Sequence, residues 1–176
     1  MSESTLRHKA EAPNKLGFGI IVCSTSRYNQ LKRGEKITDE SGDLIEKLVK
    51  EHGHSVVFRK IIPDDREAIA KEVKNVLDSP SVDVAVFCGG TGITATDVTI
   101  ETVSPFMEKT LPGFGELFRL LSYERIGSAA ILSRAFAGVA KGKVFFCVPG
   151  STDAVRLCFE KLILPEAAHI VKHVRE

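Results

Sequence analysis

Between residues 82 and 99 the chain reads Val82-Asp-Val-Ala-Val-Phe-Cys-Gly-Gly-Thr-Gly-Ile-Thr-Ala-Thr-Asp-Val-Thr99. The valine-rich first half predicts a short strand that is buried on both faces of a sheet. Three glycines around Thr91 follow, and their lack of a Cβ allows backbone N–H groups to point toward an anion. Asp97 and Thr99 add a carboxylate and a hydroxyl beside this loop. Together these features indicate a site for a phosphorylated ligand with a metal ion, although a Gly-Gly turn that only redirects the chain explains the loop equally well.

The composition is that of an ordinary globular protein. With 176 residues, 43% of them hydrophobic and 27% charged, the chain is long enough to bury one core, and we expect a single domain over 15–176 after a flexible polar tail over 1–14. The 24 basic residues nearly cancel the 23 acidic ones, so the overall charge gives no reason to bind nucleic acid or an acidic membrane. The sequence has no apolar run long enough to span a bilayer and no apolar signal region, which predicts a cytoplasmic protein.

The cysteines follow the apolar runs. Cys23, Cys88 and Cys147 each lie at the end of such a run, and Cys158 lies on the apolar face of a predicted helix. This placement is typical of small buried thiols in a reducing compartment. A zinc or redox role is the less favoured alternative, because no metal-ligand spacing connects them.

Strands and helices alternate along the chain. The hydrophobic patterning predicts strands over 16–23, 55–62, 82–88, 128–139 and 143–148, and helices that begin near residues 39, 63, 98, 116 and 151. A turn at Gly142 joins the last two strands as a hairpin, so one strand is expected to be antiparallel. The fold class is therefore α/β, a three-layer α/β/α sandwich with a mostly parallel sheet that carries one antiparallel strand.

Several polar residues permit both a structural and a functional interpretation. The segment Ser24–Gly34 is interpreted as a polar loop, in which Arg27 either binds phosphate or is simply solvated. Asp64, three residues before Glu67, fits a capping box at the start of a helix. His169 and His173 have a spacing that permits metal binding, but without a third ligand a solvated helix face is favoured. Pro165 is expected to interrupt the last helix, and the Pro-Gly-Phe-Gly segment from Pro112 is expected to form a turn.

Taken together, the motifs resemble those of the MoaB/Mog family of molybdenum-cofactor biosynthesis proteins. They occur in the family's order over roughly residues 16–170, and six weak motifs in order are specific. The matching segments are Asp39-x-Ser-Gly42, Ile62-Pro-Asp-Asp65, Gly89-Gly-Thr-Gly92 with Asp97-Val-Thr99, Pro112-Gly-Phe-Gly-Glu116, Leu132-Ser-Arg-Ala135 with Ala137-Gly138, and Pro149-Gly-Ser151.

The resemblance implies an ATP- and Mg²⁺-dependent molybdopterin adenylyltransferase that acts before molybdenum or tungsten is inserted. It implies that Asp64 and Asp97 are catalytic and hold Mg²⁺. The residues implied to bind substrate and its phosphates are Gly89, Gly90, Thr91, Gly92, Thr99, Glu116, Ser133, Gly150 and Ser151. Such a site suits the joining of two polyanions, which requires fixed donors and cations more than covalent help.

The resemblance also implies partners and leaves alternatives. Family members form trimers, in some cases paired into hexamers, and the absence of a fused insertion domain implies a separate MoeA-type molybdenum insertase. The first loop reads Ser24-Thr-Ser-Arg27, where many members have an aspartate before the arginine, so a role for this loop is in doubt. The alternatives are a non-catalytic molybdopterin carrier and a stand-alone relative of the domain found in competence-damage-type and molybdenum-insertion proteins, with other nucleotide-related substrates.

Overall fold

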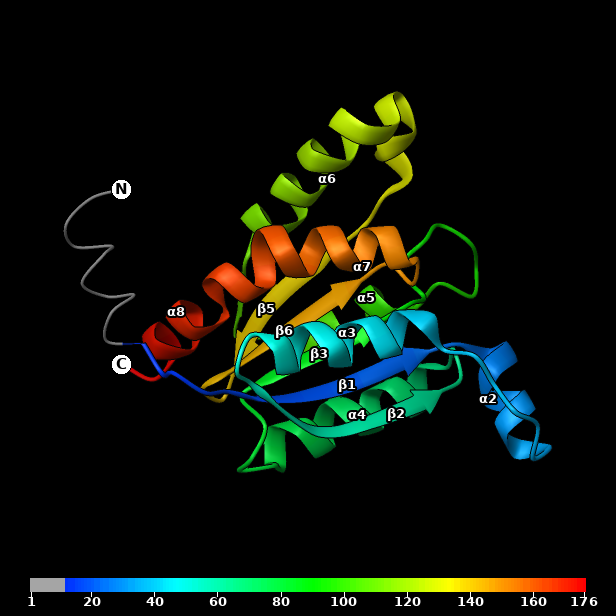
Figure 1. Ribbon diagram of the computed structural model, residues 1–176, viewed down its shortest axis with the longest axis horizontal. Helices are drawn as coiled ribbons and strands as arrows, with labels where there is room; N and C mark the ends of the chain where they lie inside the picture. The colour runs from blue at the N-terminus through cyan, green and yellow to red at the C-terminus, as the bar shows by residue number, and fades with distance from the viewer. Residues whose placement is uncertain (1–11) are drawn as a thin grey trace.

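A six-stranded sheet forms the middle layer of the protein (Figure 1), as seen in a computed structural model that describes residues 12–176. The strand order is β2-β1-β3-β6-β5-β4. The strands span Ser55–Ile62 (β2), Gly17–Cys23 (β1), Val84–Cys88 (β3), Lys143–Val148 (β6), Phe136–Ala140 (β5) and Lys109–Thr110 (β4). The tail expected over residues 1–14 lies almost entirely outside the described residues.

The sheet contains one strand of opposite direction, as predicted. β1 pairs in parallel with β2 and β3, and β3 pairs in parallel with β6. β5 runs antiparallel to both of its neighbours, β6 and β4. The carboxyl ends of β1, β2, β3 and β6 therefore meet at one edge, and the loops that leave these strands gather there.

Helices cover both faces of the sheet. On one face α3 (Glu40–Glu51), α6 (Pro112–Ile126), α7 (Thr152–Cys158) and α8 (Leu164–Val174) pack on strand residues such as Phe18 and Phe146. On the other face α4 (Arg66–Asp78) and α5 (Thr99–Val103) pack on residues such as Ile21 and Phe145. Neighbouring residues of one strand enter different clusters because side chains alternate across a strand. The three-layer α/β/α architecture is thus confirmed.

Two predicted loop segments are helical. Residues Thr25–Lys32 form α2. The preceding residue, Ser24, caps this helix, because its hydroxyl accepts a hydrogen bond from the Arg27 N–H. The turn expected at Pro112 is also wrong, since α6 begins at this proline. A proline is tolerated in the first helical turn, where its missing N–H would have no intrahelical partner.

The remaining differences concern segment ends. The strand expected over 128–139 is a 3₁₀ segment over Gly127–Leu132 followed by β5, and the short β4 was not predicted. Pro165 does not interrupt the last helix. A π-helical turn over Phe159–Ile163 joins α7 to α8, so the proline falls in the first turn of α8. No helix among residues 12–176 has the length and apolar character needed to cross a membrane.

Candidate functional site

The glycine loop follows β3 at the edge where the carboxyl ends of the parallel strands meet. Ligands bind at this edge in open α/β sheets. Gly89 has φ +104° and Gly90 has φ +62°, backbone conformations that suit glycine. A Cβ on Gly89 would collide with the Cys23 carbonyl oxygen of β1, and the Gly89 N–H donates to the Val148 carbonyl oxygen over 2.9 Å. The loop is therefore fixed between the ends of β1 and β6.

Asp97 lies beside Gly92 of this loop. Its Oδ2 accepts hydrogen bonds from the Thr94 N–H at 2.9 Å and from the Thr94 hydroxyl at 2.6 Å. The Thr94 hydroxyl, together with the N–H groups of Thr94 and Gly92 and the charge of Arg134, lowers the pKa of Asp97 despite its partial desolvation. A Cβ on Gly92 would lie 2.7 Å from Asp97 Oδ2. Asp97 is thus an ionised carboxylate held against the loop.

Asp64 lies near the same loop, beside Gly90. Its Oδ2 accepts hydrogen bonds from the N–H and the hydroxyl of Thr25 at 2.8 and 2.9 Å. A Cβ on Gly90 would lie 3.0 Å from Asp64 Oδ1. The capping-box interpretation of Asp64 is wrong, because Asp65 caps α4 by accepting a hydrogen bond from the Ala68 N–H. The two adjacent aspartates therefore differ in role: Asp65 caps a helix, and Asp64 contacts Thr25 near the glycine loop.

Most of the site residues that the family resemblance implies line one hollow of about 290 Å³. It is lined by Gly89, Gly90, Thr91, Gly92, Asp97, Leu132, Ser133, Arg134, Pro149 and Gly150. Ser151 lines an adjacent hollow, which shares Ser133 and Pro149, and its hydroxyl caps α7. Glu116 is not in this group: it lies on α6 and lines a different hollow beside Arg119 and Phe136.

Thr99 supports the loop from its buried side. It is completely buried, and its N–H donates to the Gly90 carbonyl oxygen over 3.0 Å. A Cβ on Gly90 would collide with its hydroxyl oxygen, which has no hydrogen-bond partner within the described part of the chain. The burial of Thr99 makes it a supporting residue in this conformation and does not expose it to a ligand.

Two residues of the site were not singled out from the sequence. The Arg134 guanidinium donates from Nε to the Thr91 carbonyl oxygen at 2.9 Å and from Nη2 to Glu101 Oε1 at 2.6 Å. It therefore links the glycine loop to α5. Thr25 fixes Asp64, as described above. The available signals were that Arg134 belongs to a matching motif and that Thr25 lies two residues after the first strand.

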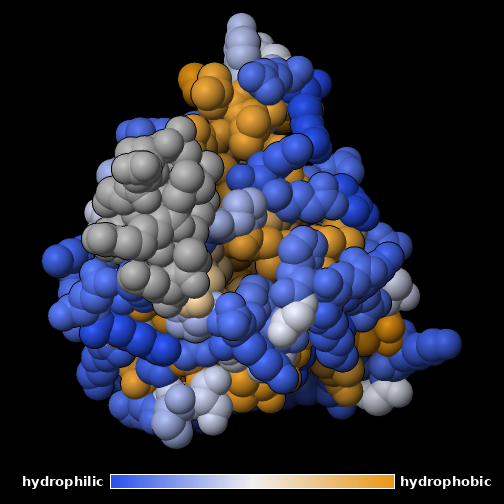
Figure 2. All heavy atoms as spheres, turned by 60° about the vertical axis from the view of Figure 1, so that its left-hand side comes forward, coloured by the Kyte–Doolittle hydropathy of each residue, from blue (hydrophilic) through white to orange (hydrophobic). Residues whose placement is uncertain are grey.

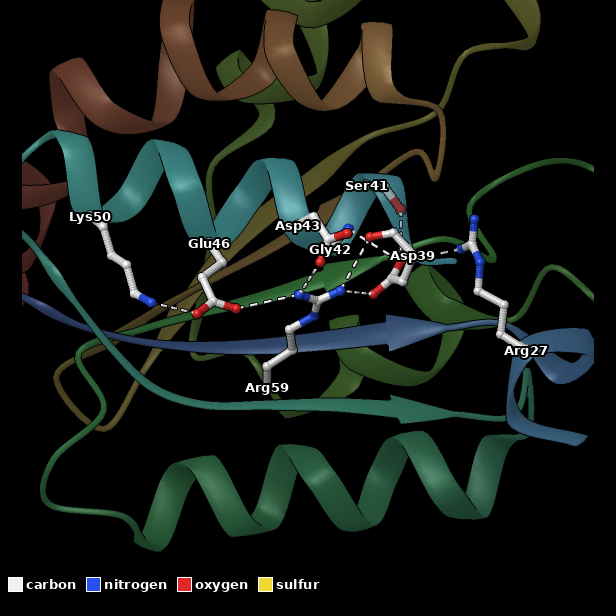
Figure 3. A network of polar contacts seen from close by, with 8 residues as sticks. All are labelled: Arg27, Asp39, Ser41, Gly42, Asp43, Glu46, Lys50 and Arg59. Atoms are coloured by element: carbon white, nitrogen blue, oxygen red, sulfur yellow. Dashed lines mark hydrogen bonds and ion pairs between the residues drawn. The ribbon is translucent and has the colours of Figure 1, made fainter. Parts of the chain in front are cut away.

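Arg27 points toward an ion-pair network that is centred on Asp39 (Figure 3). Asp39 is 4% exposed and caps α3 by accepting a hydrogen bond from the Gly42 N–H. Its Oδ2 lies 2.5 Å from Arg59 Nη2, and its Oδ1 lies 3.5 Å from Arg27 Nη1. Asp43 pairs with the same guanidinium from the surface. A Cβ on Gly42 would collide with Asp39, which explains the glycine there. The network connects the start of α3 to α2.

The carboxylates of Asp64 and Asp97 have the chemistry that Mg²⁺ prefers. Mg²⁺ usually binds one or two protein carboxylates and completes its octahedron with water and substrate phosphates. Among residues 12–176 no group of three or more His, Cys, Asp and Glu side chains is arranged to hold a metal ion by itself. Two acids beside a glycine loop therefore fit a metal that would arrive with a phosphorylated substrate.

A family model described as "Probable molybdopterin binding domain" matches residues 19–169. The chain belongs to this family. Among relatives in the molybdopterin-binding family, "Molybdenum cofactor biosynthesis protein B" of Bacillus cereus is 47% identical over 168 residues, which cover 95% of each chain. "Molybdopterin adenylyltransferase" of Pyrococcus furiosus is 43% identical over 174 residues, which cover 96% of this chain and 97% of that one. These matches confirm the resemblance seen in the motifs.

The structural comparison agrees with the family membership. The crystal structure of the tungsten cofactor synthesizing protein MoaB from Pyrococcus furiosus aligns with a TM-score of 0.77 at 39% identity. The alignment covers 94% of this chain and all of that chain. The α/β sandwich of the molybdopterin-binding family therefore extends over nearly the whole chain.

Proposed function

We propose that this protein is a molybdopterin adenylyltransferase that uses ATP and Mg²⁺ in molybdenum or tungsten cofactor biosynthesis. The observation that carries the proposal is the position of two carboxylates beside the glycine loop, Asp64 next to Gly90 and Asp97 next to Gly92. Relatives that are named for this activity or pathway support it at 43–47% identity over nearly the full chain.

In the proposed reaction a terminal phosphate oxygen of molybdopterin attacks the α-phosphorus of ATP. A P–O bond forms there, the bond from the α-phosphorus to the oxygen that bridges to the β-phosphate breaks, and pyrophosphate leaves. Charge stabilisation dominates the rate of such reactions, because two anions must approach one another. Mg²⁺, when bound, supplies positive charge to the phosphates.

Each site residue has a part in this proposal. The N–H groups of Gly90, Thr91 and Gly92 bind a phosphate, and Arg134 holds their loop in place through the Thr91 carbonyl oxygen. Gly150 and Ser151 bind a second phosphate near the start of α7. Asp64 and Asp97 hold the Mg²⁺ that accompanies the phosphates, and Thr25 and Thr94 orient these carboxylates through hydrogen bonds. Ser133 lies beside the pterin substrate. Glu116 lies outside this group, so it binds substrate, as the resemblance implies, only if α6 contacts the ligand or another copy of the chain.

We also propose that the protein is a homo-oligomer, a trimer or hexamer, that contacts itself through α6. Helix α6 and the following 3₁₀ segment project from the body of the protein, and hydrophobic side chains gather near their tip (Figures 1 and 2). The exposed apolar residues of α6 and the 3₁₀ segment are Leu117, Leu120, Tyr123, Ile126, Ile131 and Leu132. An apolar surface of this kind is typical of an interface between proteins.

The same proposal places the protein in the cytoplasm, where a MoeA-type insertase receives its product. The free, buried cysteines at positions 23, 88, 147 and 158 suit a reducing compartment. The product is an activated pterin, so an enzyme that exchanges its nucleotide for a metal must act next.

The deciding experiment measures adenylylated molybdopterin that is formed from purified protein, molybdopterin, Mg²⁺ and ATP. Asp64→Asn and Asp97→Asn should each lower the rate at least about a hundredfold, the effect of removing a key electrostatic group. Asp65→Asn is the matched control: this neighbouring acid only caps α4, and asparagine caps equally well. Tight pterin binding without product from the wild type would instead identify a molybdopterin carrier.

A further inference from the structure

Two histidines on α8 face one another. His169 and His173 lie one helical turn apart, their ring centroids are separated by 4.7 Å, and their Nε2 atoms are 3.0 Å apart. Their side chains are 20% and 43% exposed. The pair is therefore accessible to small solutes.

Two carboxylates fix the tautomers of these rings. His169 Nδ1 is 2.9 Å from Glu166 Oε2, and His173 Nδ1 is 3.0 Å from Glu176 Oε2. An ionised carboxylate only accepts hydrogen bonds, so each Nδ1 must carry the proton. In the neutral rings both Nε2 atoms then present a lone pair, and two unprotonated nitrogens only 3.0 Å apart repel one another. A cation that both nitrogens bind converts this repulsion into attraction.

The distances suit a transition-metal ion. Metal–nitrogen bonds of about 2.0–2.1 Å to two atoms 3.0 Å apart correspond to an N–metal–N angle of about 90–97°. This angle is close to that of neighbouring ligands in square-planar or octahedral coordination, and imidazole is a preferred ligand of Zn²⁺, Cu²⁺ and Ni²⁺. Histidines at positions i and i+4 of a helix provide two zinc ligands in known metal motifs. Carboxylates that accept from Nδ1 are the usual support of metal-binding histidines.

The pair lies in an open cleft away from the glycine loop. This cleft has a volume of about 550 Å³, and Glu108, Lys109 and Gly142 line it opposite α8. Arg175 Nε donates to the Gly142 carbonyl oxygen, which fixes the end of α8 near the start of β6. The glycine loop lies at the carboxyl ends of the parallel strands, whereas α8, which lines this cleft, lies toward their amino ends (Figure 1).

We propose that His169 and His173 form a binding site for a divalent transition-metal ion of the imidazole-preferring class, with Glu166 and Glu176 as positioning residues. The two side chains supply two ligands, and water from the cleft supplies the others. The metal joins successive turns of α8 and thereby stabilises the carboxyl-terminal helix. This site is independent of the proposed adenylyl transfer, so either proposal can fail without the other.

The test is a calorimetric titration of the full-length, tag-free, EDTA-treated protein with Ni²⁺ and with Zn²⁺, in excess Mg²⁺ to occupy carboxylate sites. We expect one ion per chain. His169→Gln and His173→Gln each remove one of the two protein ligands and should weaken metal binding at least about tenfold. Glu166→Gln removes the supporting charge and should weaken metal binding about tenfold. His52→Gln is the matched control, since His52 ends another helix.

A second measurement separates lost ligation from lost folding. Metal should raise the unfolding temperature of the wild type and of His52→Gln, and this rise should disappear in the His169→Gln and His173→Gln variants while they remain folded. Cu²⁺ should show two coordinated nitrogens in its electron paramagnetic resonance spectrum. Metal binding that is unchanged in both histidine variants would overturn the proposal. A pair that shares a proton and binds no metal would overturn it equally.

Discussion

The Arg134 guanidinium donates from Nε to the Thr91 carbonyl oxygen over 2.9 Å, and this single hydrogen bond joins the glycine loop to the segment that precedes β5. The same guanidinium pairs with Glu101 of α5. The loop therefore depends on a side chain that comes from more than forty residues further along the chain. Its shape is a tertiary property and not a local one.

Replacement of Arg134 should loosen the loop. We expect Arg134→Ala to raise the KM for ATP several-fold, because the amides of the loop lose their fixed orientation. The free energy of unfolding should fall by about 1–3 kcal/mol, since Glu101 loses its partner. Steady-state kinetics and urea unfolding measure the two effects. In Glu101→Gln the bond to Thr91 remains, so an equal rise of KM in that variant would contradict this explanation.

Gly90 should not tolerate a side chain. Gly90→Ala places a Cβ at φ +62° and against the Thr99 hydroxyl, so we expect a loss of more than about 1 kcal/mol of unfolding free energy together with most activity. Gly113→Ala is the control, because no atom lies within 4 Å of its Cβ position and alanine favours the helix. Similar behaviour of the two variants in thermal unfolding would refute the assigned strain.

The carboxylate of Asp97 should titrate below its ordinary range. Carbon-detected NMR of the carboxyl group is expected to give a pKa that is lowered in the folded protein and rises in Thr94→Val, which removes the hydroxyl donor. Because the folded-state pKa lies below the unfolded value, the resulting stabilisation is present above the unfolded pKa and is lost as pH falls through the folded one. Unfolding of wild type and Thr94→Val should therefore converge in acid. A stability gap that persists at low pH would point to packing instead.

Asp39 should contribute far more to stability than Asp43, although both pair with Arg59. Asp39→Asn preserves the cap of α3 but removes a nearly buried charge opposite two guanidinium groups, so we expect a loss of about 2 kcal/mol in urea unfolding. Asp43 is largely exposed, and Asp43→Asn should cost less than about 0.5 kcal/mol. Equal losses would mean that burial does not determine the strength of this network.

The exposed apolar residues of α6 and of the 3₁₀ segment that follows it should control assembly. Leu120→Glu and Ile131→Glu place charges on the proposed interface, so light scattering after size exclusion should show smaller particles than the wild type. Leu31→Glu, at an exposed leucine on α2, should leave the particle mass unchanged. A monomeric wild type would refute the proposed oligomer directly.

Sequence reasoning was accurate where local chemistry decides the structure. Strand β2 was predicted with its observed ends, and the helix predicted to begin near residue 39 is α3, after which Gly53 has the positive φ that such a position favours. It failed where the outcome depends on distant partners. Two neighbouring aspartates look equally suitable as a cap in the sequence, and only the tertiary contact of Asp64 with Thr25 and the cap bond of Asp65 distinguish them. Likewise, a short edge strand such as β4 gains its hydrogen bonds from β5, which lies more than twenty residues away.

The burial of the four thiols makes the protein a reporter of its own unfolding. All four cysteines are buried, and burial raises the pKa of Cys23 and of Cys88 to about 12 and keeps those of Cys147 and Cys158 high as well. Only the thiolate is alkylated readily, so iodoacetamide should react slowly with the folded chain. The pace of labelling, followed by mass spectrometry without any introduced probe, should then record how often the central sheet opens.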